Sequence, residues 1–93
     1  MKISVEIAFS FKHELDPGYR ALELIDGATV LDAFEQLSER FPLMRDRILD
    51  ESGCVLKHIN ALINGENVQY RKGFDSVLED GDRLSILPPV GGG

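Results

Sequence analysis

The chain has 93 residues, with 10 Lys and Arg against 16 Asp and Glu, so its net charge is -6. This length suits one domain, because two halves would each be too small to bury a stable core. The negative charge disfavours nucleic acid and anionic membrane surfaces as partners, and the single cysteine, Cys54, excludes an internal disulfide and a CxxC pair. No apolar stretch has the length of a signal-peptide core or a membrane span, so we expect a cytoplasmic protein.

The first segment alternates between apolar and polar residues, which predicts a strand with one buried face. Its apolar set is Ile3, Val5, Ile7, Phe9 and Phe11. A turn is predicted at residues 16–18, where the sequence is Asp-Pro-Gly. A second strand is predicted over residues 19–24, with Leu22 and Leu24 pointing inward.

The period then changes to that of a helix. The apolar stripe consists of Val30, Ala33, Phe34, Leu37 and Phe41. Thr29 precedes the stripe and Asp32 follows three residues later, which predicts a capping box at the helix N-terminus. Pro42 ends the predicted helix, because the residue before a proline avoids the α conformation.

A second short helix is compatible with residues 43–51. Apolar residues return at 59–63, and the Asn64-Gly65 dipeptide then predicts a hairpin. The return strand is expected to include Val68 and Tyr70. Residues 74–78 are expected to form a short turn packed on the core, with Phe74, Val77 and Leu78 as its apolar members. A last strand is predicted over residues 83–87, with Leu84 and Ile86 on one face.

Two strands, a helical crossover and further strands are the element order of an α+β, β-grasp fold: a mixed sheet with one main helix packed on it. In that fold the first and last strands lie side by side and parallel in the centre of the sheet. We expect a β-grasp domain over residues 1–88, followed by a flexible tail over residues 89–93.

The C-terminal tail carries the strongest functional signal. Pro88 and Pro89 stiffen the exit from the last strand, and Val90 and three glycines, Gly91, Gly92 and Gly93, follow. A tip without side chains can thread a narrow channel in a second protein, and residues 89–93 reach at most about 17 Å. It would deliver the Gly93 α-carboxylate, which can attack the α-phosphorus of ATP to form an acyl-adenylate. The alternative is an inert terminus or cloning residues.

Four motifs in order resemble a known family. They are Asn64-Gly65-Glu66, Leu78-Glu79-Asp80-Gly81-Asp82, Leu87-Pro88-Pro89-Val90 and the terminal Gly-Gly. Together they resemble the MoaD/ThiS-type ubiquitin-like sulfur carriers, and most closely MoaD, the small subunit of molybdopterin synthase. The chain departs from the pattern in its third terminal glycine and in a longer stretch over residues 43–58.

The resemblance implies a ubiquitin-like β-grasp and a specific chemistry. A MoeB/ThiF-type activating enzyme would use ATP to adenylate Gly93, which would become a thiocarboxylate. Pro89, Val90, Gly91 and Gly92 would thread the tail into a MoaE-type large subunit, where the sulfur passes to a pterin precursor. The chain itself would bind no cofactor and would be a sulfur-donating subunit rather than an enzyme alone.

Partner contact is expected on the sheet face beside the tail. The candidates are Phe9, Phe11, Leu62, Phe74 and Leu87, with Phe74, Leu87 and Phe9 preferred. A protein modifier conjugated to lysines, and a carrier for tRNA thiolation or tungsten cofactor, remain alternatives. So does a plain interaction domain with inert glycines. No metal site is expected, since the two histidines, His13 and His58, lie 45 residues apart in the sequence.

Overall fold

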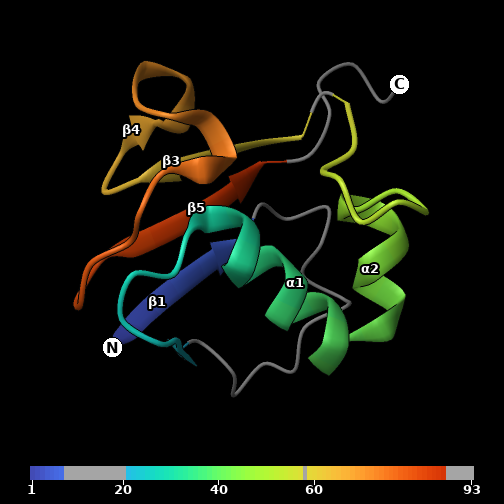
Figure 1. The fold of residues 1–93 in the computed structure, drawn as a ribbon, viewed down its shortest axis with the longest axis horizontal. Coiled ribbons are helices and arrows are strands. Elements are labelled where there is room, and N and C mark those ends of the chain that lie inside the picture. Colours follow the sequence, from blue (N-terminus) through green and yellow to red (C-terminus); the bar gives the residue numbers. More distant parts are fainter. Residues whose placement is uncertain (8–20, 58, 88–93) are drawn as a thin grey trace.

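The computed structural model describes residues 1–7, 21–57 and 59–87. A five-stranded mixed sheet forms one layer and helix α1 (Val30–Arg40) packs across one face of it (Figure 1). The strands are β1 (Lys2–Ile7), β2 (Ala21–Glu23), β3 (Asn60–Ile63), β4 (Glu66–Asn67) and β5 (Arg83–Leu87). The expected turn at 16–18 and the residues Phe9, Phe11, His13, Tyr19 and His58 lie outside the described residues.

The sheet order is β2-β1-β5-β3-β4, which places the last strand in the centre. β5 runs parallel to β1, with Ser4 opposite Arg83 and Ile7 opposite Ile86, and antiparallel to β3. β2 is antiparallel to β1 on the outer side. The predicted β-grasp topology is therefore confirmed, including the parallel central pair.

Helix α1 begins where the sequence predicts. The Thr29 hydroxyl accepts a hydrogen bond from the Asp32 amide at 3.2 Å, and the Asp32 carboxylate accepts one from the Thr29 amide at 2.8 Å. This reciprocal pair satisfies two of the amides that a helix N-terminus leaves without partners. The predicted stripe is buried from Val30 to Leu37, while Phe41 is half-buried and forms the C-cap.

Pro42 ends α1 and also begins α2 (Pro42–Ile48), where it occupies the first turn. Proline is tolerated there because the amide it lacks would have had no partner in the helix. The second helix predicted over 43–51 is therefore present and ends earlier. Its last residue, Ile48, is fully buried.

The Asn64-Gly65 dipeptide forms the predicted hairpin turn between β3 and β4. Asn64 has φ 52° and Gly65 has φ 86°, both in the left-handed region that the tight hairpin turn requires. The prediction that Val68 and Tyr70 continue the return strand is wrong. β4 stops at Asn67, whose side chain accepts from the Gln69 amide at 2.8 Å, and Val68–Tyr70 is a 3-10 helix, η2.

The segment before β5 contains a second 3-10 helix, η3 (Gly73–Asp75). Phe74 packs against the core and Leu78 is buried, as predicted, but Val77 is 53% exposed. Val77 pairs with Thr29 through an isolated β-bridge, so its neighbours Ser76 and Leu78 point inward while Val77 points outward. The expectation that Val77 packs on the core is therefore wrong.

The core fills the space between α1 and the sheet. Its largest fully buried side chains include Phe34, Ile3, Leu22, Leu37, Ile48, Ile63, Leu84 and Ile86. Strand residues at alternate positions supply the sheet side of this core, as period-two patterning requires. None of the described helices is long and apolar enough to cross a membrane.

Candidate functional site

Strand β5 divides its side chains between the two faces of the sheet. Leu84 and Ile86 are fully buried beneath α1, so Arg83, Ser85 and Leu87 lie on the opposite face. Because directly paired residues share a face, the register places neighbours from β1 and β3 beside them. We call this surface the open face; its central members are Ser4, Glu6, Asn60, Leu62, Arg83, Ser85 and Leu87.

The apolar members of the open face lie at the end where β5 finishes. Leu62 pairs with Ser85, and Asn60 pairs with Leu87, so Leu62 and Leu87 are diagonal neighbours on adjacent strands. Both side chains are half-buried. Such a pair can contribute apolar contact area at a docking surface next to the segment that follows Leu87.

The polar members of the open face form a weak cluster on the β1–β5 pair. Glu6 accepts from the Ser85 hydroxyl at 3.4 Å and lies 3.8 Å from Nε of Arg83. The side chains of Arg83 and Glu6 are 60% and 66% exposed, so water screens their attraction and it adds little stability. Both charges therefore remain accessible to a partner.

The structure does not bring all the predicted contact residues to one surface. Phe74 lies on the helix side of the sheet, where its ring centroid is 5.5 Å from that of Phe34, whereas Leu87 lies on the open face. Phe9 and the tail residues Pro89, Val90, Gly91, Gly92 and Gly93 lie outside the described residues. The binding role assigned to Phe74, Leu87 and Phe9 stays a prediction.

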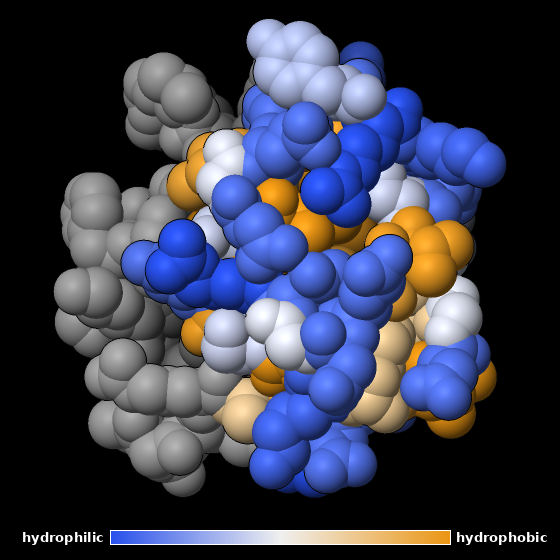
Figure 2. Space-filling model, turned by 90° about the vertical axis from the view of Figure 1, so that its left-hand side faces the viewer, coloured by the Kyte–Doolittle hydropathy of each residue, from blue (hydrophilic) through white to orange (hydrophobic). Residues whose placement is uncertain are grey.

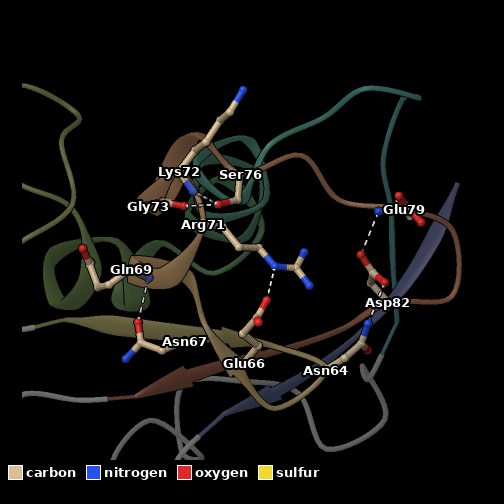
Figure 3. Close-up of polar contacts among 10 residues, drawn as sticks. All are labelled: Asn64, Glu66, Asn67, Gln69, Arg71, Lys72, Gly73, Ser76, Glu79 and Asp82. Carbon is tan, nitrogen blue, oxygen red and sulfur yellow. Dashed lines mark hydrogen bonds and ion pairs between the residues drawn. The ribbon is translucent and has the colours of Figure 1, made fainter.

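Hydrogen bonds of Asn64 and Asp82 fix the other end of β5, and Figure 3 shows those that join Asn64, Asp82 and Glu79. Asn64 donates from Nδ2 to Asp82 at 2.8 Å, and its Oδ1 accepts from the Arg83 amide at 2.9 Å. The second Asp82 oxygen accepts from the Glu79 amide at 2.8 Å. The side chain of Asp82 is nearly buried, which its position in an acidic Asp-Gly-Asp turn does not by itself predict. The sequence shows the Asn-Gly and Asp-Gly-Asp motifs separately, and only the fold shows that Asn64 and Asp82 are hydrogen-bonded to each other.

An ion pair lies beside this network on the hairpin. Arg71 donates from Nε to Glu66, and this hydrogen bond, with the further carboxylates of Asp82 and Glu79, holds the pKa of the Arg71 guanidinium above its usual range (Figure 3). Both side chains are exposed, so the pair orients Arg71 rather than stabilising the fold.

Within residues 1–7, 21–57 and 59–87, no group of three His, Cys, Asp or Glu could hold a metal ion. Cys54 is an exposed free thiol.

Comparisons with known proteins agree with this architecture. The ThiS family model matches residues 9–93. Small archaeal modifier protein 3 of Haloferax volcanii is 40% identical over 68 residues, which cover 73% of each chain. Sulfur carrier protein CysO of Mycobacterium tuberculosis is 30% identical over 69 residues, covering 72% of this chain and 74% of CysO.

A solved structure extends the agreement to the whole molecule. The crystal structure of small archaeal modifier protein 1 from Haloferax volcanii covers 100% of both chains with a TM-score of 0.81 and 27% identity. The fold is thus that of the ubiquitin-like β-grasp proteins. The family model, the sequence identity and the shared fold together show that this chain belongs to the ThiS family.

Proposed function

We propose that this chain is a ubiquitin-like sulfur carrier whose reactive group is the α-carboxylate of Gly93. The observation that carries the proposal is the central position of β5, which is hydrogen-bonded to β1 and β3 and leads into residues 88–93. A terminus that leaves from the middle of a sheet starts at a fixed place relative to the open face. Membership of the ThiS family and the similarity to CysO support the same role.

The proposed chemistry has two steps. A carboxylate oxygen of Gly93 attacks the α-phosphorus of ATP, a phosphorus–oxygen bond forms, and pyrophosphate leaves. Hydrosulfide then attacks the acyl carbon, AMP leaves, and the terminus becomes a thiocarboxylate. A MoeB/ThiF-type activating enzyme would bind the ATP, since this chain contains no GxxxxGK[ST] motif.

The tail residues have a steric role in this proposal. Gly91 and Gly92 let the backbone approach an enzyme channel closely, because they carry no Cβ. Pro89 and Val90 restrict the segment that joins them to β5. Leu87, the last described residue, would then contact the partner at the channel mouth.

The proposed destination is the small subunit of molybdopterin synthase, in a complex with a MoaE-type large subunit in the cytoplasm. The ordered motifs from Asn64 to the terminal Gly-Gly support this destination. In that complex the Gly93 thiocarboxylate would donate its sulfur to the pterin precursor, while catalytic side chains would come from the large subunit.

A second candidate is a protein modifier joined through Gly93 to lysines of other proteins. The 40% identity with small archaeal modifier protein 3 favours it. It shares the adenylation step and differs in the nucleophile, which is a lysine amine in place of hydrosulfide.

Two measurements test these candidates, the first for the step they share and the second for the step in which they differ. Pyrophosphate exchange with a ThiF-type enzyme of the same organism tests adenylation, which both require. Arg83 is the last Lys or Arg in the chain, so trypsin would leave residues 84–93 attached to any modified lysine. Peptides that carry this ten-residue branch would establish conjugation to lysines. Pyrophosphate exchange and a Gly93 thiocarboxylate, found without such peptides, would support the sulfur carrier alone.

A further inference from the structure

The segment over residues 42–57 consists of α2 and a hydrogen-bonded loop that follows it. Its loop closes through a bridge between Leu49 and Val55, and the Leu56 amide donates to the Ile48 carbonyl at 2.9 Å. Inside the loop, one carboxylate oxygen of Asp50 accepts from the amides of Ser52 and Cys54, at 2.8 and 3.0 Å. The buried Ile48 and Leu49 anchor the segment to the core.

This segment lies at the end of the sheet where β5 finishes. Asn60 is directly opposite Leu87, and the Ile59 amide donates to the Leu56 carbonyl at 3.3 Å. Leu56 is four residues before Asn60, so their Cα atoms are at most about 15 Å apart. Figure 1 likewise shows α2 and the segment after it at the end of the sheet toward which the β5 arrow points.

The segment carries a shallow hollow of about 530 Å³. Its lining consists of Arg45, Asp46, Leu49, Asp50, Glu51 and Leu56. Three carboxylates against one guanidinium leave this lining with a net charge of -2, and the two leucines make part of it apolar. Asp46 and Glu51 are exposed, whereas Asp50 is engaged in its own loop. The hollow therefore suits a basic side chain that lies next to an apolar one.

The length of the tail limits where a partner can lie. Residues 88–93 span at most about 20 Å when extended. An enzyme that encloses the carboxylate of Gly93 must therefore contact the molecule close to the end of β5, where this segment and the open face are both present.

We propose that the hollow over residues 45–56 is a docking site for a lysine- or arginine-bearing loop of the activating enzyme that adenylates Gly93. This inference rests on the proposed function. The hollow adds affinity and orientation to the encounter, because complementary charge at the rim of an interface accelerates association. The hollow takes no part in the chemical step. Its loss should therefore raise the KM of the activating enzyme for this chain and leave kcat unchanged.

The test is a double charge reversal, Asp46→Lys with Glu51→Lys, in the full chain. Neither side chain has a hydrogen bond or ion pair in the described structure, so the fold is expected to persist, as thermal unfolding would check. The matched control is Glu35→Lys with Asp75→Lys, two exposed acids that do not line the hollow. Pyrophosphate exchange is measured with the ThiF-type enzyme of the same organism, at two salt concentrations.

We expect the hollow variant to raise the KM of the activating enzyme for this chain by about tenfold at low salt, with kcat unchanged. The control variant should give a KM within about twofold of the wild-type value. Added salt should narrow the difference. Equal KM values for the hollow variant and the control variant would overturn the inference. The proposed function would still be supported in that case, provided that the wild-type chain supports pyrophosphate exchange. If the hollow variant lost only its binding to a sulfur-accepting partner, the inference would also be overturned, because that partner and not the activating enzyme would occupy the hollow. Absence of exchange with the wild type would instead contradict the proposed function.

Discussion

Asn64 joins three parts of the fold through its backbone conformation and its side chain. Its left-handed backbone conformation turns the β3–β4 hairpin, its Nδ2 binds Asp82, and its Oδ1 binds the Arg83 amide at the start of β5. The sequence predicted the first of these from the Asn-Gly pair alone. The other two need the 79–82 turn to lie beside the hairpin, which no local pattern specifies.

Replacing Asn64 with Ala should lower the free energy of unfolding by about 2–3 kcal/mol, because two hydrogen bonds are lost and a β-carbon without polar compensation stays at positive φ. Asn64→Gly loses the same bonds without the conformational penalty, so it should cost about 1 kcal/mol less. Urea denaturation of both variants measures the difference. Equal stability of Asn64→Ala and wild type would contradict the role of this residue.

Helix α1 shows why some elements are predictable at the scale of the element. Its cap, apolar stripe and end are all local signals, and each is found where the sequence places it. The return strand after Asn64-Gly65 was mispredicted because Val68, which suits a strand by propensity, is drawn into the core by tertiary packing.

The capping box gives a prediction for this element. Thr29→Ala should destabilise the protein by about 1 kcal/mol, since the Asp32 amide loses its partner. Thr29→Ser keeps the hydroxyl and should be nearly neutral. Thermal unfolding of the two variants, together with Asp32→Ala and the double variant, would measure the coupling. Additive effects of Thr29→Ala and Asp32→Ala would argue against a reciprocal cap.

At the scale of the whole molecule, the surfaces differ in character. The end opposite α2 is mostly hydrophilic, with separate hydrophobic areas, in the view of Figure 2. Leu62 and Leu87 lie instead beside the end of β5 on the open face. The order of elements in the sequence predicted the topology correctly. The sequence also placed Phe74 and Leu87 on one face of the sheet, although the structure places them on opposite faces. Phe74 lies in a 3-10 helix, and period-two alternation does not show which way the side chains of such a segment point.

A paired substitution tests whether the open face binds partners. Leu87→Ser should raise the KM of the activating enzyme for this chain by about tenfold and, because Leu87 is half-buried, lower the free energy of unfolding by about 1–2 kcal/mol. Val77→Ser removes an apolar side chain that is 53% exposed and lies outside the open face, so it should leave this KM unchanged. Pyrophosphate exchange provides the readout, and an equal effect of both variants would exclude a specific role for the open face.

The most direct test of the carrier role is the intact mass of the protein after incubation with the activating enzyme, ATP and sulfide. The proposal predicts a species heavier by the difference between a sulfur and an oxygen atom, located at Gly93. Deleting both Gly92 and Gly93 should abolish that species and leave the unfolding transition unchanged; removing Gly93 alone would still leave a Gly-Gly end. An unmodified mass on the full-length chain, under conditions where the enzyme exchanges pyrophosphate, would contradict the sulfur-carrier role.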